Sequence, residues 1–230
     1  MPTIVFVSPK GGAGKTTAAT ILAIQLAKET TVTIIDADPN HPIRNWSTGG
    51  NTPPNLTIIS DVDENSIADR IDDAAEKTPF VIVDLEGTAA KIVVLAVARA
   101  DFVIVPTQGS QLDAEQAGRA LKVIKDQENS MRRVAPDYKL PYSVLLTRTN
   151  SAIRTRTLRH IHKGLIDAGI PVFKNELNER EAFRAMFSFK QTLENLDTAK
   201  VANLDKAILN AELFAKEVIE VLHKTMKKGG

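Results

Sequence analysis

The chain has 230 residues, 43% of them apolar and 25% charged, which is typical of a globular protein and argues against long disordered segments. Its 29 basic and 28 acidic side chains leave a formal charge of +1, so a surface that binds nucleic acid would have to be local. The sequence contains no cysteine, which excludes thiolate metal sites, iron–sulfur clusters, thiol nucleophiles and disulfide bonds.

Short apolar, β-branched runs alternate with longer stretches of helical composition along the chain. The predicted strands cover residues 4–7, 31–35, 80–83, 101–105 and 143–146, with an edge strand at 171–173. The predicted helices cover residues 16–28, 66–76, 89–99, 112–127, 154–168 and 204–224. Continuously apolar strands are buried on both faces, so the pattern predicts an α/β fold with a mostly parallel β-sheet flanked by helices on both faces. Because the sequence shows no repeat and no linker, we expect one domain over residues 1–230.

A glycine-rich segment, KGGAGKTT from Lys10 to Thr17, separates the first predicted strand from the first predicted helix. Glycines let backbone N–H groups turn inward around phosphates, and the N-terminus of the following helix attracts the same anion. Lys15 supplies a positive charge, and the Thr16 hydroxyl can reach Mg²⁺. The segment predicts a phosphate site made by Gly11, Gly12, Ala13, Gly14, Lys15, Thr16 and Thr17. It departs from the pattern G-x-x-x-x-G-K-[ST] because Pro9 occupies the first glycine position.

Acidic residues stand where two of the predicted strands end. Asp36 follows the strand at 31–35, Asp38 lies two residues further on, and Asp84 follows the strand at 80–83. Open α/β sheets bind ligands beyond the carboxyl ends of their strands, so we expect these carboxylates near the glycine-rich segment. Asp84 ends a buried strand, a position suited to holding a water molecule on Mg²⁺. A purely structural role for each acid, as a helix cap or turn residue, stays open.

The glycine-rich segment, with its second lysine Lys10, resembles the deviant Walker A motif of the ParA/MinD superfamily of ATPases. Four further segments resemble motifs of the same superfamily: TIIDADPN (33–40), VIVDLEGT (81–88), VIVPTQGSQLDAEQA (103–117) and LLTRTN (145–150). Leu85 and Glu86 stand where the superfamily usually has proline or alanine. The resemblance covers most of the chain and implies a P-loop NTPase fold with ATP and Mg²⁺ as cofactors.

The resemblance also implies roles for single residues. Asp38 orients the attacking water, while Thr16, Asp36 and Asp84 lie at the metal. Lys10 and Lys15 act on the phosphates, Lys15 within its own subunit and Lys10 across the interface of an ATP-sandwich homodimer. Asn150 pairs with adenine, since an amide offers both a donor and an acceptor to adjacent base atoms. Guanine is disfavoured because the sequence contains no N-K-x-D segment.

Basic side chains accumulate between residues 148 and 163, where no acidic residue interrupts them. Arginines form salt-sensitive contacts to DNA phosphates that do not depend on sequence. The members that we expect to bind DNA are Arg154, Arg156 and Arg159. A solvated basic helix face is the alternative, although the resemblance favours nonspecific DNA because dimers of the superfamily bind it through scattered basic residues.

Two functions fit the resemblance. The first is a small plasmid-partition ParA-type ATPase, cytoplasmic and nucleoid-associated, whose hydrolysis is stimulated by a centromere-binding ParB-like protein. The second is the related ATPase that assists relaxase-initiated DNA transfer, which the segment DADPNHPIRNW (36–46) also resembles. A third alternative, a membrane-positioned regulator of the MinD type, is disfavoured because the apolar stripe of helix 204–224 starts far from the chain end and favours core packing. No apolar run is long enough for a membrane span, and the first residues lack the basic start of a signal peptide.

Overall fold

The computed structural model describes residues 1–9, 11–86 and 90–226. Within these ranges seven strands form one sheet in the order β3-β2-β4-β1-β5-β6-β7, and every pair of neighbouring strands is parallel. The strands are β1 (Thr3–Phe6), β2 (Val32–Ala37), β3 (Leu56–Ile59), β4 (Phe80–Leu85), β5 (Phe102–Thr107), β6 (Tyr142–Thr149) and β7 (Leu177–Asn178). The first strand lies at the centre of the sheet, so the segment that follows it emerges between the carboxyl ends of β4 and β5.

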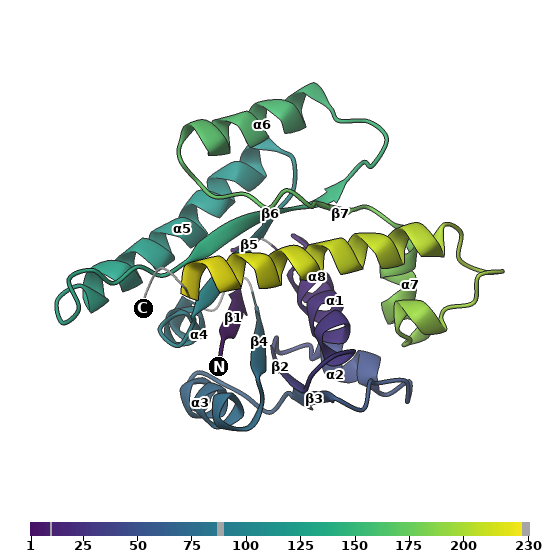
Figure 1. Ribbon diagram of the computed structural model, residues 1–230, viewed down its shortest axis with the longest axis horizontal. Helices are drawn as coiled ribbons and strands as arrows, with labels where there is room; N and C mark the ends of the chain where they lie inside the picture. Colours follow the sequence, from purple (N-terminus) through teal and green to yellow (C-terminus); the bar gives the residue numbers. More distant parts are fainter. Residues whose placement is uncertain (10, 87–89, 227–230) are drawn as a thin grey trace.

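Helices cover both faces of the sheet (Figure 1). Each face has its own apolar core. They are α1 (Lys15–Ala27), α2 (Pro42–Ser47), α3 (Ile67–Lys77), α4 (Ala90–Val97), α5 (Gln111–Met131), α6 (Arg156–Asp167), α7 (Glu181–Phe189) and α8 (Leu204–Met226), with a 3₁₀ turn at Leu193–Asn195. Side chains of α1, α2, α7 and α8 fill the core on one face, and side chains of α3 to α6 fill the core on the other. This arrangement confirms the predicted α/β fold.

The last helix, α8, packs its apolar stripe into the core as expected. Phe214 is fully buried and meets the ring of Phe173 edge to face at 5.8 Å, and Phe173 meets Phe102 in the same way at 6.2 Å. Val218 and Leu222 continue this buried stripe toward the end of the helix. Among the described residues no helix is both long and apolar enough to cross a membrane.

The predicted edge strand at 171–173 is wrong in extent. Val172 makes only an isolated bridge to Val144, and the edge strand of the sheet is β7, a few residues later. The ladder stops because the next two amides turn to another element: Lys174 N and Asn175 N donate to the Glu217 carboxylate of α8 at 2.7 and 2.8 Å. A side chain of α8 therefore takes the place of the neighbouring strand.

The helix predicted from residue 154 begins two residues later, at Arg156. Thr155 is its N-cap, and its hydroxyl accepts a hydrogen bond from Leu158 N at 3.1 Å. Threonine satisfies one of the free N–H groups of the first turn in this way, which fixes the helix start. Arg154 consequently lies outside the helix, in the preceding loop.

Candidate functional site

The glycine-rich segment forms a tight loop between β1 and α1, at the carboxyl edge of the sheet. Gly12 and Gly14 adopt positive φ angles of 76° and 84°, a conformation that side chains with a Cβ rarely take. Gly14 is the residue before the helix, and its carbonyl accepts the first helical hydrogen bond, from Ala18 N at 2.9 Å. Lys15 is thus the first residue of α1, where the positive end of the helix dipole lies. Lys10 lies outside the described residues.

A side chain of β6 and one from the residue after β5 contact the backbone of the loop. The Thr147 hydroxyl lies 2.7 Å from the carbonyl oxygen of Ala13 and 3.2 Å from that of Thr107. The amide of Gln108 donates to the carbonyl oxygen of Gly12 at 2.8 Å. These contacts fix the backbone of the loop through residues more than ninety positions away in sequence.

Lys15 is surrounded by carboxylates. Its side chain is only 7% exposed, and this burial lowers the pKa of its ammonium group below the ordinary value. The charges of Asp84, Asp38 and Glu86, in decreasing order of effect, oppose that lowering. One buried cation therefore lies near three acids: Asp38 after β2, Asp84 in β4 and Glu86 directly after β4. The sequence predicted Asp38 and Asp84 near this loop, and Glu86 is an addition.

Asp36 and Asp84 lie side by side on neighbouring strands. They are register partners in the pairing of β2 with β4, and both are fully buried. Burial raises the pKa of Asp84 to about 7, with the charge of Asp36 adding to the rise and the Thr16 hydroxyl and Lys15 opposing it. Among the described residues, neither carboxylate oxygen of Asp84 has a partner that meets the distance and angle limits of a hydrogen bond. Such buried, unpartnered oxygens are costly unless a cation or proton satisfies them.

Asp36 uses one oxygen for structure. Its Oδ2 accepts hydrogen bonds from the backbone N–H groups of Ile43 and Arg44, each at 2.9 Å, in the first turn of α2. Its Oδ1 is buried without a hydrogen-bond partner in the described part of the chain. Burial raises the pKa of Asp36, and the two backbone hydrogen bonds oppose this rise. Asp36 thus caps α2 with one oxygen while it lies beside Asp84 in the carboxylate cluster.

Asp38 lies in the turn directly after β2. Its Oδ1 accepts hydrogen bonds from the backbone N–H and the side-chain amide of Asn40, both at 2.9 Å. The His41 N–H donates to the Asp38 carbonyl oxygen at 2.8 Å, which closes the turn. The turn fixes Asp38 close enough to Lys15 for its charge to act on the lysine.

A family model described as VirC1 protein matches residues 1–228 of the chain. The chain belongs to the VirC1 family. It is 36% identical over 228 residues to Protein ParA of Rhizobium radiobacter, covering 99% of this chain and all of the relative. The family model and this relative together confirm the predicted ParA/MinD-type identity.

Solved structures of ParA- and MinD-type proteins share the fold. A putative plasmid partition protein of Borrelia burgdorferi bound to AMPPNP has a TM-score of 0.70 at 18% identity, covering 95% of this chain and 98% of its own. The septum site-determining protein MinD of Pyrococcus horikoshii with Mg-ADP has a TM-score of 0.68 at 16% identity, with coverage of 97% and 98%. ParA- and MinD-type proteins are ATPases with roles in partition or positioning, so membership in the VirC1 family places the chain in this class of nucleotide-binding proteins.

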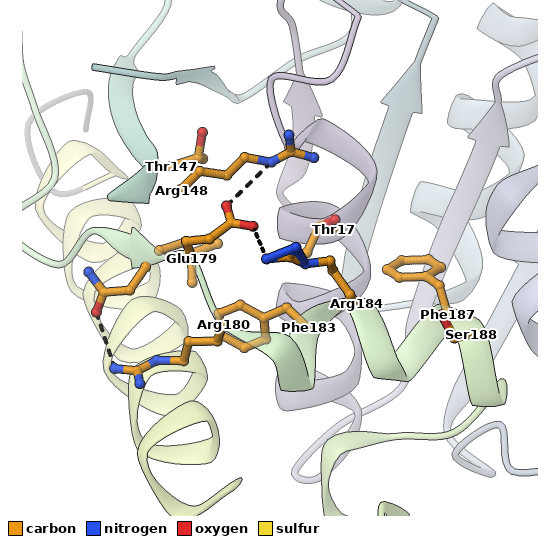
Figure 2. A pocket seen from close by; sticks show the side chains of 12 residues that line it. Thr17, Thr147, Arg148, Glu179, Arg180, Phe183, Arg184, Phe187 and Ser188 are labelled. Atoms are coloured by element: carbon orange, nitrogen blue, oxygen red, sulfur yellow. Dashed lines mark hydrogen bonds and ion pairs between the residues drawn. The ribbon is translucent and has the colours of Figure 1, made fainter. Parts of the chain in front are cut away.

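A cavity of about 350 Å³ opens beside the glycine-rich loop of this VirC1-family protein. Gly14 and Thr17 form its wall on the loop side, and α7 contributes the rings of Phe183 and Phe187 (Figure 2). The volume falls within the roughly 300–1,000 Å³ typical of ligand pockets. Sequence reasoning did not identify α7 or these two phenylalanines, because the nine-residue helix EAFRAMFSF carries no motif.

Charged side chains line the mouth of the cavity. The carboxylate of Glu179 lies between two arginines, 3.7 Å from Arg148 Nε and 2.6 Å from Arg184 Nη2 (Figure 2). Arg148 adopts a φ of 52°, at the point where the register of β6 against β7 shifts. A non-glycine residue in this region is strained, and such strain is common at functional sites.

Asn150 and the basic residues lie elsewhere. The Asn150 Oδ1 accepts hydrogen bonds from Ala152 N and Ile153 N at 2.8 and 2.9 Å, and the residue is exposed and does not line the cavity. Its pairing with adenine stays a prediction. Arg154 forms an ion pair with Glu176 at 2.7 Å. Arg156 and Arg159, by contrast, are exposed on α6, and no acidic side chain in the described ranges pairs with either of them.

Within the described residues, no three histidine or acidic side chains gather into a group that could hold a metal by themselves. Mg²⁺ in nucleotide sites keeps several waters and takes one or two carboxylates together with phosphate oxygens. Asp84, with two oxygens that lack a partner in the described part of the chain, and the neighbouring Thr16 hydroxyl are the donors that fit.

The raised pKa of Asp84 predicts how the stability of the ligand-free protein depends on pH. Between about pH 4 and pH 7 the folded state holds a proton on Asp84 that the unfolded state has lost, so the free energy of unfolding falls as the pH rises through this window. Asp84→Asn removes the cost of ionising this buried carboxyl. We expect the free energy of unfolding of the variant to exceed that of wild type by up to about 4 kcal/mol at pH 8, and to differ little from it below pH 4.

Thermal or urea unfolding from pH 4 to pH 8, in EDTA and without nucleotide, measures this difference. Asp69→Asn, which replaces an exposed acid on α3, is the matched control and should follow the wild-type profile. Parallel profiles for wild type and Asp84→Asn would contradict the predicted ionisation of Asp84.

Proposed function

We propose that this chain is an ATP-dependent DNA partition ATPase, a single domain over residues 1–230 that forms an ATP-sandwich dimer, binds nonspecific DNA and is switched off when a partner stimulates hydrolysis. One observation carries the ATPase: a buried lysine at the first turn of α1 stands among carboxylates of β2 and β4, at the carboxyl edge of the sheet. Phosphoryl transfer to water requires charge neutralisation and positioning, and these residue types supply both.

Each residue has one part in the proposed reaction. Lys15 binds the phosphates, and the backbone of Gly11 to Gly14 surrounds them together with Thr16 and Thr17. Thr16 and Asp84 hold Mg²⁺, with Asp36 beside it. Bound Mg²⁺ neutralises charge on the phosphate oxygens. Asp38, fixed in its turn by Asn40, orients the attacking water.

The base of the nucleotide is proposed to lie in the cavity beside the loop. Phe183 and Phe187 offer apolar ring surface, and Thr17 and Gly14 connect the cavity directly to the phosphate loop. Asn150 directly follows β6 and does not line this cavity. To pair with adenine, its amide would have to give up the hydrogen bonds that it accepts from Ala152 N and Ile153 N.

Lys15→Ala tests the nucleotide site. The substitution removes the main positive charge that faces the phosphates and leaves the buried acids without their cation, so we expect ATP affinity to fall by roughly 100-fold or more. Calorimetric titration with ATP and Mg²⁺ measures this, with circular dichroism to verify folding. Lys77→Ala, an exposed lysine on α3, should bind as wild type does. Wild-type ATP affinity in Lys15→Ala would remove the basis for the phosphate site.

The dimer is proposed from the second lysine of the loop. Lys10 and Lys15 stand in one short glycine-rich segment, where two cations in one subunit would repel each other. In an ATP-sandwich dimer Lys10 instead reaches the phosphates of the partner subunit. Cations that act in this way across an interface contribute about 10³–10⁵ in rate to related phosphoryl transfers.

A mixing experiment distinguishes action in trans from action within one subunit. Lys10→Ala alone should retain ATP binding but lose dimerisation and hydrolysis, and Asp38→Ala should bind ATP yet hydrolyse it slowly. In a heterodimer of the two, the site of the Lys10→Ala subunit has its own Asp38 and receives the lysine of its partner. Partial recovery of hydrolysis on mixing, measured as phosphate release, is the expected result. Absence of recovery, with dimers seen by light scattering, would place Lys10 in its own site.

DNA binding is proposed for the exposed arginines of α6. Arg156 and Arg159 lie one turn apart, so they share a face of the helix, and neither is neutralised by an acid in the described part of the chain. Arg154 is a weaker candidate because Glu176 already pairs with it. A dimer doubles these contacts, which links DNA binding to the ATP-bound state.

The double variant Arg156→Ala/Arg159→Ala should weaken binding to every duplex and flatten its salt dependence, by about one unit of slope for each DNA phosphate that the variant no longer neutralises. Arg154→Ala, the matched control, should have a smaller effect. Gel shifts on unrelated duplexes with ATP and Mg²⁺, at several salt concentrations, measure both. If the double variant binds as wild type does, the DNA surface lies elsewhere. ATP affinity should be unchanged, because these side chains do not line the cavity.

A second candidate function rests on the resemblance of residues 36–46 to the ATPase that assists relaxase-initiated DNA transfer. An ATPase that assists relaxosome assembly in conjugative DNA transfer would use the same nucleotide and DNA surfaces but a relaxase as its partner. The 36% identity to Protein ParA favours partition. Stimulation of the ATPase by a purified relaxase, compared with a centromere-binding protein from the same replicon, separates the two functions. Either role is proposed for the cytoplasm, at the nucleoid.

A further inference from the structure

The short helix α2 connects the carboxylate cluster to α7. At its start, Ile43 N and Arg44 N hold the Oδ2 atom of Asp36, each at 2.9 Å. Asp36 is fully buried and lies in register with Asp84. The first turn of α2 is therefore fixed to the acids of the phosphate site.

The other end of α2 is fixed to the end of α7. The indole N–H of Trp46 donates to the carbonyl oxygen of Gln191 at 3.0 Å, and the residue is only 2% exposed. The ammonium of Lys190 donates to the Thr48 hydroxyl at 2.7 Å. Gly49 packs so closely on Lys190 that a β carbon there would overlap the lysine carbonyl oxygen. Three separate contacts thus join the last turn of α2 to two consecutive residues.

Those two residues terminate α7, the helix that lines the cavity. Lys190 is the C-cap, in the left-handed conformation with a φ of 53°, and Gln191 N donates to Met186 O at 3.0 Å. Phe183, Arg184 and Phe187, further back on the same helix, line the cavity beside the loop (Figure 2). A displacement of α7 is therefore transmitted to the residues that contact Trp46.

We propose that Trp46 is a positioning residue that couples occupancy of the cavity by the nucleoside to the placement of Asp36 and Asp38 at the phosphates. The inference rests on the proposed function, in which the base enters this cavity. The buried indole N–H requires a hydrogen-bond partner, and the partner that it has is a backbone carbonyl just past the end of α7, so this bond joins α2 to that helix. Coupling through a rigid element fixed at both ends requires contacts of this kind.

Hydrolysis kinetics test the coupling. Trp46→Phe keeps an aromatic ring but loses the N–H, so we expect kcat to fall about tenfold while KM for ATP changes less than about twofold. The inference would be overturned if KM for ATP rose by the same factor as kcat fell, or if kcat stayed at the wild-type value. Thr48→Ala gives a second test on the surface, where folding is not at risk, since it removes the contact to Lys190 and should lower kcat in the same direction.

Ser47→Ala is the matched control for Thr48→Ala. Both hydroxyls donate to the carbonyl oxygen three residues earlier, Ser47 to Arg44 O and Thr48 to Asn45 O, but of the two it is Thr48 that also receives the lysine at the end of α7. Ser47→Ala should hydrolyse ATP as wild type does. An equal loss of kcat in both variants would show that α2 itself, and not its contact with α7, matters.

Fluorescence provides a readout that a packing role would not move. Trp46 is the only tryptophan of the chain, so all indole emission comes from this side chain and its surroundings. We expect ATP to change the emission of wild type, and inorganic tripolyphosphate, which lacks a base, to change it much less at concentrations where it displaces ATP. Equal changes with both ligands, or a change with neither, would overturn the coupling. Calorimetry of each ligand is run in parallel, and if ATP itself does not bind, it is the proposed function that fails.

Discussion

The burial of Asp36 and Asp84 on neighbouring strands is the constraint on which the site depends. Two carboxylates in register, neither with exposed surface, cannot both ionise without a nearby cation, and the pKa of Asp84 accordingly rises to about 7. Lys15 offsets part of this cost, but burial also lowers its own pKa. The protein alone therefore stabilises these charges incompletely, and any ligand that brings positive charge to the acids and phosphate to the lysine stabilises the folded state by mass action.

Residues far from the loop in sequence hold this site in place. Thr147 and Gln108 contact the carbonyls of the loop from β6 and from the end of β5, and α7 closes the cavity beside it. The edge of the sheet is closed in turn by α8: Glu217 accepts from the amides of residues 174 and 175, and Asn210 accepts from Asn178 N at 3.0 Å. Edge strands with free amides invite pairing with other chains, and here side chains of the last helix occupy those amides.

The sequence predicts the parts of the fold that repeat a strong local pattern. Continuously apolar strands, the glycine loop and the acids that follow the strands could be read directly, because burial on both faces and phosphate binding each impose residue types at fixed spacing. The helix α2 could not be predicted from the sequence, since a segment of six residues beginning with Pro42 is too short to show the apolar periodicity of a helix. The cavity residues Phe183 and Phe187 come near the glycine-rich loop only through the tertiary placement of α7. Arg154 illustrates the same limit: its charge is visible in the sequence, but its pairing with Glu176 depends on tertiary structure.

The weak bulk charge of the chain restricts how the proposed DNA surface can work. With a formal charge of +1 and two arginines on α6 that no acid in the described ranges pairs, the proposed surface of one subunit offers few phosphate contacts to a duplex. Affinity for a polyanion rises steeply with the number of contacts, because each one releases condensed counterions, so joining two subunits multiplies affinity instead of merely doubling it. Under the proposed function, control of dimerisation is therefore control of DNA binding. Nucleotide binding would then control dimerisation and DNA binding together, because the nucleotide stabilises the buried acids and completes the proposed dimer interface. Its hydrolysis would release the DNA without any change in the arginines themselves.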